Sequence, residues 1–373
     1  MTPIRALIDL GALRHNLATL RARAPSSRIT AVVKANAYGH GAIPVARALA
    51  TKIDSLAVAR LDEGLELRAA GVSAPLMVLE GVFSEREQHT AIRAAIELVV
   101  HDVEQLRLIE QSPPPAGSVV WLKFDTGMHR LGFEPSQATA LWRRLRVAAP
   151  AAELRVMTHL ACADESDHPL TRAQLDAFVH AQEQIASMQS GRVPLSSIGN
   201  SAGTLGEPRA RSDWIRPGLA LYGASPFTTR TAASLDLRPV MTLETRVLAL
   251  QSVAAGDSVG YGASWRAARP SRIAIAGCGY ADGVPRSLPS GTPVAVWPRA
   301  SASPPQPVAV PIVGRVSMDL IALDVTDVPG LTNGDRVVLW GEGAPIETLA
   351  AAAGTLAYEL WCRVAPRVPR VYL

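Results

Sequence analysis

The sequence predicts an α/β protein in which a (β/α)₈ TIM-type barrel is followed by a C-terminal, mostly-β domain. Its 373 residues exceed what one hydrophobic core usually serves, so two domains are expected. Through the first two-thirds, short apolar runs alternate with helical stretches. After about residue 235 the helical periodicity nearly vanishes, and short apolar runs are separated by Gly, Pro, Asp and Asn. We therefore expect one domain over residues 1–235 and a second over residues 236–373.

Eight apolar runs in the first part are the expected barrel strands. Strands that alternate with helices imply a parallel sheet, and eight such strands can close into a barrel. The seventh crossover, residues 200–212, leaves room for only a short helix. A ninth run, residues 4–9, has no obvious barrel position and is a candidate to join the C-terminal domain. The eight runs are residues 29–34, 55–59, 75–79, 98–100, 118–124, 154–158, 195–198 and 214–216.

Composition excludes several classes of protein. Hydrophobic residues make up 48% and charged residues 19% of the chain, which is typical of an ordered globular protein. The net charge is only +4, and no run of Lys and Arg forms a stripe, so we expect no nucleic-acid partner. No apolar segment approaches the length of a membrane span, and the N-terminus lacks the apolar core of a secretion signal. With three widely spaced cysteines, a reduced cytoplasmic location is expected.

Polar residues gather at the carboxyl ends of the expected strands. In barrels of this kind those ends and their loops form the active site. Five of the eight strands deliver a charged or hydrogen-bonding side chain there, which a purely structural barrel would not need. These residues are Lys34, Lys123, Arg130, His159, Asn200, Ser201 and Arg216.

Each of these residues also has a purely structural interpretation. A lone lysine after a strand is usually solvated, and a lone histidine is more often hydrogen-bonded than catalytic. Arg216 is harder to explain in this way, because a guanidinium at a barrel mouth needs an anion or an aligned acceptor. We expect no metal, since one cluster that could be drawn matches no common zinc spacing; it comprises His159, Cys162, Asp164 and His168.

The loops after strands seven and eight indicate a phosphate site. Barrel phosphate sites are commonly built there. Residues 200–203 and 217–219 are small, so backbone N–H groups could approach an anion, and Ser201 adds a hydroxyl. A lysine across the same barrel mouth, Lys34, suggests pyridoxal phosphate bound covalently to that lysine.

Nine segments resemble the motifs of bacterial alanine racemases, in family order and over nearly the whole chain. The resemblance implies a pyridoxal-phosphate enzyme that interconverts L-alanine and D-alanine and supplies D-alanine for peptidoglycan. The segments are VVKANAYGHG, LKFDTGMHRLGF, MTHLACADE, IGNSAG, IRPGLALYGASP, SVGYGASW, GYADGVPR, GRVSMDL and LAYELWCR.

The resemblance also implies how the cofactor is held. Lys34 corresponds to the lysine that binds it covalently. Arg216 corresponds to an arginine that faces the pyridine nitrogen and is bonded by His159. The remaining cofactor-binding positions, most of them at the phosphate, are Tyr38, Asn200, Ser201, Gly218, Leu219 and Tyr358.

Other matched positions concern the substrate. Arg130 corresponds to a residue near the substrate carboxylate, and Lys123 to a lysine often carbamylated that orients it. Tyr261, the second catalytic base, and Met318, a pocket residue, come from the partner subunit in the family, which implies a homodimer with shared active sites. Supporting positions that follow Met318 or line the corridor to the site are Asp319, Tyr280 and Arg286. One departure is Ser317, where many members carry cysteine; it should alter the pocket polarity slightly.

Racemisation requires proton exchange on both faces of Cα, and one base per face is the simplest design. The family assigns the D-enantiomer to Lys34 and the L-enantiomer to Tyr261. A tyrosine with an ordinary pKa of ~10 is a poor base, so we expect His159 and Arg216 to favour its phenolate as cations. Arg216 should also keep the pyridine nitrogen unprotonated and so disfavour transamination.

Three alternatives remain open. Non-catalytic pyridoxal-phosphate carriers share the barrel and lysine but usually lack the second domain. Decarboxylases of the same two-domain fold have Glu where Arg216 stands. A broader-specificity racemase of small amino acids is the third; the periplasmic members of that group carry signal peptides.

Overall fold

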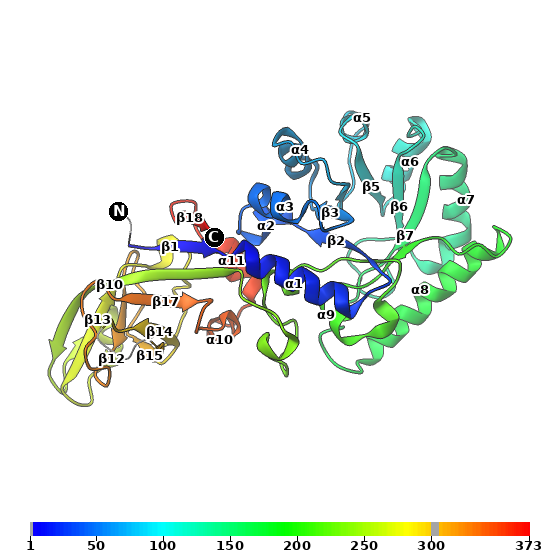
Figure 1. Cartoon of the computed structure of the whole chain (residues 1–373). Helices are drawn as coiled ribbons and strands as arrows, with labels where there is room; N and C mark the ends of the chain where they lie inside the picture. Colours follow the sequence, from blue (N-terminus) through cyan, green and yellow to red (C-terminus); the bar gives the residue numbers. More distant parts are fainter. Residues whose placement is uncertain (1–2, 300–305) are drawn as a thin grey trace.

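The computed structural model describes residues 3–299 and 306–373, in which two bodies lie side by side (Figure 1). One is a closed barrel of eight parallel strands with helices around it. The other is an eight-stranded, mostly antiparallel sheet. The predicted fold class is therefore confirmed.

The barrel strands are almost wholly buried, as expected for parallel strands covered by helices. Each lies within a run that the sequence predicted, or overlaps it. In pairing order they are β2 (Arg28–Val32), β3 (Ser55–Val58), β4 (Leu76–Val78), β5 (Ile96–Val100), β6 (Val119–Lys123), β7 (Glu153–Met157), β8 (Ser196–Ser197) and β9 (Trp214–Ile215).

Several of the helices of this body begin at side-chain caps. Asp9 accepts a hydrogen bond from the backbone N–H of Ala12 at 2.8 Å, and Asp102 accepts one from that of Glu104 at 2.8 Å. The short helix predicted in the seventh crossover is present as α9. The helices are α1 (Leu10–Arg23), α2 (Lys34–Tyr38), α3 (Ala42–Leu49), α4 (Leu61–Ala69), α5 (Glu85–Arg93), α6 (Val103–Gln111), α7 (Ala138–Ala148), α8 (Pro169–Ser187) and α9 (Ser201–Gly206).

The second body is built on one long strand, β10, which pairs with β1, β13 and β17. A small hairpin of β11 (Ser258–Val259) and β12 (Trp265–Arg266) is attached to it in sequence. Two helices, α10 (Ile346–Ala352) and α11 (Ala357–Arg363), lie between the last two strands of the sheet in sequence. In spatial order the strands are β13 (Ser271–Ala276), β16 (Ile321–Asp324), β15 (Val308–Val313), β14 (Pro293–Trp297), β17 (Arg336–Trp340), β10 (Met241–Val253), β1 (Arg5–Ile8) and β18 (Arg370–Tyr372).

The run at residues 4–9 has a defined place. As β1 it pairs antiparallel with β10 and parallel with β18, so it belongs to the second sheet rather than to the barrel. The buried Asn16 of α1 ties the following helix to the connecting chain: its amide donates to Leu221 O and Arg238 O at 3.1 and 2.8 Å and accepts from Arg238 N at 2.7 Å. The two bodies are thus joined at both the start and the middle of the chain.

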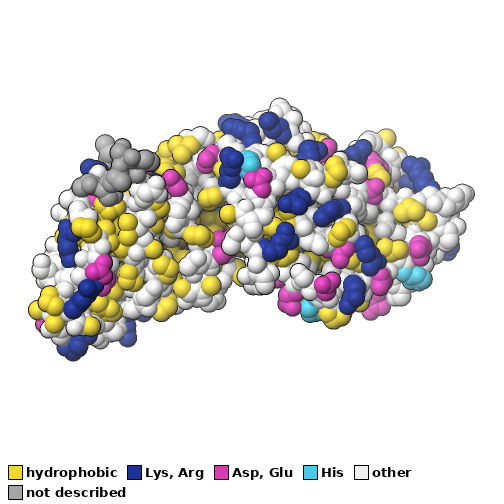
Figure 2. Space-filling model, turned by 60° about the horizontal axis from the view of Figure 1, so that its bottom comes forward, with side chains coloured by type: hydrophobic (Ala, Val, Ile, Leu, Met, Phe, Trp, Pro, Cys, Tyr) yellow, Lys and Arg dark blue, Asp and Glu magenta, His cyan; other side chains and the backbone are white. Residues whose placement is uncertain are grey.

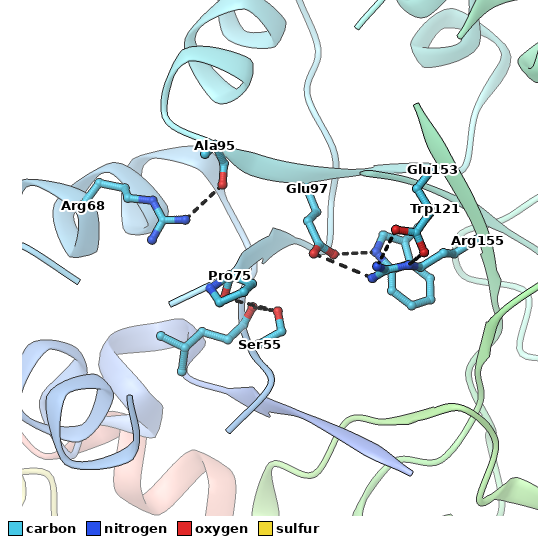
Figure 3. A network of polar contacts seen from close by, with 9 residues as sticks. Ser55, Arg68, Pro75, Ala95, Glu97, Trp121, Glu153 and Arg155 are labelled. Atoms are coloured by element: carbon cyan, nitrogen blue, oxygen red, sulfur yellow. Dashed lines mark hydrogen bonds and ion pairs between the residues drawn. The ribbon is translucent and has the colours of Figure 1, made fainter. Parts of the chain in front are cut away.

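A charged network fills the barrel near the amino-terminal ends of its strands (Figure 3). Arg155 of β7 donates two hydrogen bonds to Glu153, at 2.8 and 3.0 Å, and lies 3.7 Å from Glu97 of β5. Trp121 Nε1 donates to Glu97 at 2.7 Å. The guanidinium also packs about 5 Å from the rings of Trp121 and Trp214. This end of the barrel is closed by matched charges and aromatic faces.

The surface shows no basic stripe on the face drawn in Figure 2, where Lys and Arg side chains are scattered among acidic ones. Within the described ranges, no helix has both the length and the apolar character needed to cross a membrane.

Candidate active site

A cavity of about 520 Å³ opens at the carboxyl ends of the barrel strands. It brings together most of the residues singled out from the sequence, although they come from the ends of five different strands, or the loops after them, and from α11. The predicted residues that line it are Lys34, Tyr38, Lys123, Arg130, His159, Asn200, Ser201, Arg216, Gly218 and Tyr358.

The loops after β8 and β9 form a close-fitting wall on one side of this cavity. Ser201 Oγ accepts hydrogen bonds from the backbone N–H groups of Gly218 and Ala220, at 3.0 and 3.1 Å. A Cβ at Gly218 would stand 2.5 Å from Tyr38 Oη, so only glycine permits this approach. Four cationic side chains face a single acidic lining residue, Glu80. The cavity therefore fits an anionic ligand such as pyridoxal phosphate, with Lys34 on its wall.

Lys34 begins α2, which is a left-handed turn rather than an ordinary helix. Ala35, Asn36, Ala37 and Tyr38 all have φ between +50° and +54°. Non-glycine residues adopt this conformation at a cost of about 1–2 kcal/mol each, so contacts elsewhere must stabilise the turn. Residues of the predicted cofactor site thus lie on strained backbone, as is common where function requires it.

Aromatic packing and the end of the sheet both support this turn. Tyr38 packs edge-on against Tyr222, with ring centroids 5.0 Å apart, and lies 5.4 Å from Tyr358. From β18, Arg370 donates to Gly39 O at 2.8 Å and Tyr372 donates to His40 O at 3.2 Å. The second body therefore helps to shape the Lys34 segment of the first.

Arg216 is buried, with only the cavity side of its guanidinium open, and every acceptor it uses is neutral. It donates to Ser197 Oγ, to Thr158 O at 2.5 Å and to Ile198 O at 3.3 Å. No ion pair of Arg216 occurs within residues 3–299 and 306–373. Burial and the neighbouring Arg130 lower its pKa to about 10, which leaves it charged at neutral pH.

His159 corrects one expectation. Its Nδ1 lies 3.5 Å from Arg216 Nη2. Burial, and then the charge of Arg216, hold the pKa of His159 well below its usual range. The imidazole is therefore neutral at neutral pH, and the expectation that it acts as a cation beside the second base was wrong, because sequence does not reveal its burial against Arg216.

The two lysines of the cavity have lowered pKa values. Burial, followed by Arg216 and Arg130, lowers the pKa of Lys123 to about 8. Burial and Arg130 lower the pKa of Lys34, while the carboxylates of Glu80 and Glu63 act in the opposite direction. Both amines are thus closer to their neutral, nucleophilic form than free lysine is.

Arg130 is carried by a loop wound around one carboxylate. Asp125 accepts from the backbone N–H groups of Gly127, Met128 and His129 through Oδ1, at 2.9 to 3.0 Å, and from that of Arg130 through Oδ2 at 3.0 Å. Arg130 also lines a neighbouring cavity of about 560 Å³ between the loops after β4, β5 and β6. A fixed loop backbone therefore presents an exposed guanidinium beside the site.

Several predicted residues do not line the cavity of their own chain. Tyr261, in the loop between β11 and β12, has 67% of its surface exposed, and Met318 has 53%. Tyr280 N donates to Ser317 O at 3.0 Å, which joins the Tyr280 and Met318 loops. Arg367 bridges Asp319 and Asp282, at 2.6 and 2.8 Å. Leu219 adjoins Gly218, and Arg286 is exposed on the second body.

Two ionisable residues of the cavity lining were missed from the sequence, Glu80 and Cys362. Glu80 lies two residues beyond β4, so the strand-end rule applied to the other strands could have found it. Cys362 follows Tyr358 by one helical turn of α11 and so shares its face, a spacing that could have indicated it.

Two family models match the chain. Residues 8–226 match the alanine racemase N-terminal domain, and residues 240–372 match the alanine racemase C-terminal domain. The alanine racemase of Thioalkalivibrio sulfidiphilus is 48% identical over 372 residues, covering 99% of this chain and 98% of that protein. The biosynthetic alanine racemase of Pseudomonas aeruginosa is 44% identical and the catabolic one of Pseudomonas putida 43% identical, each covering 100% of this chain and 99% of the relative.

Solved structures agree with these matches. The crystal structure of biosynthetic alanine racemase from Pseudomonas aeruginosa superposes with a TM-score of 0.91 at 44% identity, covering all of both chains. The structure of alanine racemase from Acinetobacter baumannii also gives 0.91, at 38% identity and with the same coverage.

Proposed function

The chain belongs to the alanine racemase family, and on that premise we propose that it interconverts L-alanine and D-alanine with Lys34 and Tyr261 as opposed acid–base groups. The observation that carries the proposal is the cavity at the barrel mouth, where a lysine of lowered pKa faces a small-residue wall and a cluster of cations.

Pyridoxal phosphate, on which this family depends, makes the α-proton of a bound amino acid acidic. In this chain Lys34 would hold it covalently. Its phosphate would be bound by Tyr38, Ser201, Tyr358 and the backbone of Gly218 and Leu219, with Asn200 fixing the loop through its 2.9 Å bond to Gly203 N. Arg216 would face the ring nitrogen.

Lys34 Nζ would exchange a proton with one face of Cα. Its burial and the neighbouring Arg130 favour the neutral amine, which is the form that accepts a proton. Arg130 offers a planar fork suited to the substrate carboxylate and thereby orients the amino acid beside Lys34.

Tyr261 Oη would serve the opposite face, supplied by a second copy of the chain. Its exposure, together with that of Met318, supports a homodimer in which each subunit completes the other's site. Arg216, rather than the neutral His159, is the enclosed cation available to favour the phenolate. In the partner position Met318 would limit the substrate side chain, while Tyr280, Arg286 and Asp319 would line the approach.

Arg216 is proposed to select the reaction. It is charged, it has no acceptor, and its donors already bind neutral oxygens. It therefore cannot hold a proton on the ring nitrogen as a carboxylate would, which disfavours transamination.

Lys123 is proposed to be carbamylated and to orient Arg130. Only a neutral amine adds to carbon dioxide, and a pKa of about 8 leaves an appreciable neutral fraction at physiological pH. The carbamate would replace like-charge repulsion from Arg130 with attraction.

The proposed physiological role is supply of D-alanine for peptidoglycan, in line with the biosynthetic relative. Free cysteines suit the proposed cytoplasmic location. Deletion of the gene should create a requirement for added D-alanine; growth without it would contradict the role.

The test of the activity combines trapping with assays. Borohydride treatment should label a peptide containing Lys34, and a panel of amino acids should show racemisation of alanine above the rest. Tyr261→Phe should retain the cofactor yet cripple conversion from L-alanine. An unlabelled Lys34 or an unaffected Tyr261→Phe variant would contradict the proposal.

A further inference from the structure

We infer that Glu63 is a positioning residue for Lys34: its carboxylate binds the left-handed turn that presents the lysine and ties it to the neighbouring loop. The inference rests on the proposed role of Lys34 as the covalent cofactor site. It extends that proposal by naming what holds the strained backbone in place.

The carboxylate of Glu63 bridges two strand ends. Oε1 accepts from the backbone N–H of Ala35, the residue after Lys34, at 2.5 Å. Oε2 accepts from the N–H groups of Ala59 and Arg60, at 2.8 and 3.1 Å. One side chain thus links the loop after β2 to the loop after β3.

The Glu63 bridge contacts the strained backbone at the residue where the positive φ values begin. Ala35 is the first of the consecutive residues with positive φ, and its side chain is exposed, so packing cannot hold it. Two backbone bonds of the turn are local, Ala37 N to Val33 O at 2.8 Å and Gly39 N to Ala35 O at 2.9 Å, and the bonds from Arg370 and Tyr372 reach only its far end. The Glu63 contact joins the first residue of the turn to a separate element.

Three donors converge on this group, which explains why it is a carboxylate. An ionised carboxylate accepts at both oxygens, whereas an amide has one oxygen and one NH₂ group. In Glu63→Gln the NH₂ must face either Ala35 N–H or the Ala59 and Arg60 N–H groups. One side of the bridge is therefore lost while the size of the side chain is kept.

The chain contains a matched control. Glu87 occupies the same third position of α5 that Glu63 occupies of α4, and it accepts from Phe83 N at 2.7 Å. This bond stays within its own loop and touches no residue of the cavity around Lys34. Glu87→Gln therefore measures the loss of a helix-start glutamate alone.

The experiment compares the parent protein with Glu63→Gln, Glu87→Gln, Ala35→Gly and the double variant Ala35→Gly/Glu63→Gln. Hydrogen exchange over residues 35–41 reports the turn without cofactor, titration with pyridoxal phosphate reports binding, and the absorbance of the bound cofactor reports the covalent state. Kinetics with alanine then separate kcat from KM.

Glu63→Gln should speed exchange over residues 35–41 and weaken pyridoxal-phosphate binding by about ten- to a hundredfold. It should also lower kcat more than it changes KM. Glu87→Gln should match the parent in all of these. Glycine adopts positive φ without strain, so Ala35→Gly should partly restore binding in the Glu63→Gln background.

Equal exchange and equal cofactor binding in Glu63→Gln and Glu87→Gln would overturn the inference. If Glu63→Gln does not fold, the double variant is compared with Ala35→Gly, and equal affinity in that pair would overturn it as well. Failure of borohydride to label Lys34 in the parent would instead refute the proposed function, and the exchange data would still decide whether Glu63 holds the turn.

Discussion

The two ends of the barrel each enclose an arginine, and they treat its charge in opposite ways. Arg155, near the amino ends of the strands, is 6% exposed, and Arg216, at the carboxyl ends, is 5% exposed. Arg155 has two carboxylate neighbours and two tryptophan faces. Arg216 has only neutral acceptors and lies among other cations.

The same strands carry both environments. Trp121 and Lys123 are two residues apart on β6, and Trp214 and Arg216 are two apart at β9, so each pair faces the same side of the sheet. Lys123 and Arg216 line the cavity, which places both tryptophans toward the barrel interior below it. In the lower layer, around Arg155, the positive charge is paired with carboxylates and the layer stabilises the fold. In the upper layer, around Arg216, the positive charge is left free for a ligand.

The largest effect is expected when a negative charge is introduced at the carboxyl ends of the strands, as is already present at the amino ends. Arg216→Glu should slow racemisation roughly 10³-fold, because a preorganised charge is reversed at the reacting centre. Transamination should rise, detected as pyridoxamine phosphate by chromatography. Arg216→Lys serves as the charge-preserving control. Unchanged partitioning between the two reactions in Arg216→Glu would contradict the role proposed for Arg216.

Removing the compensated arginine should affect stability instead. Arg155→Ala leaves Glu97 enclosed without its partner, and burial already raises the pKa of that carboxyl. The free energy of unfolding should fall by about 3–4 kcal/mol, measured by urea denaturation. The variant that remains folded should keep the parent kcat. A large loss of kcat with little loss of stability would break the distinction between the two ends.

Lys123→Met should have the opposite sign from Arg155→Ala. The folded protein lowers the pKa of Lys123 from 10.5 to about 8. The charged amine therefore destabilises the folded state below about pH 8, and the free energy of unfolding rises as the pH increases from about 8 to 10.5. At pH 7 the substitution should raise the free energy of unfolding by about 2 kcal/mol while lowering activity. The measurement is made in buffer free of carbon dioxide. Destabilisation there would mean that the charge of Lys123 is compensated.

The smallest effect is expected at the edge of the lower network. Glu153 is half exposed and binds Arg155 through both oxygens. Glu153→Gln should lower the free energy of unfolding by about 0.5–1 kcal/mol and leave kcat unchanged. Thermal denaturation in low and high salt checks this, since screening should reduce the difference. A loss as large as that of Arg155→Ala would place the main compensation at Glu153 rather than Glu97.

Much of the upper layer could be predicted because the sequence shows where the strands end. An apolar run followed at once by Lys34 or His159 indicates a barrel rim without any knowledge of contacts. The lower layer could not be predicted, since Glu97 and Arg155 interrupt apolar strands and their partners lie on other strands. Tyr261 was reached only through the family resemblance, because it lies in the second body.

Local propensity also could not predict the turn at Lys34. None of Ala35, Asn36 and Ala37 is a glycine, yet all three have positive φ. The conformation is imposed by tertiary contacts, among them Glu63 and Arg370, which are distant in sequence. The neutral state of His159 has the same origin, since it depends on burial and then on an arginine 57 positions away.

The hydrogen bonds from Arg370 and Tyr372 to Gly39 and His40 span 331 and 332 positions of the chain. During translation the lysine turn therefore emerges from the ribosome long before its last supports are made. The cofactor loop lacks these two bonds until the β18 segment has been synthesised and has docked beside β1. We therefore expect the completed chain to bind the vitamin-derived cofactor more tightly than a chain that lacks β18.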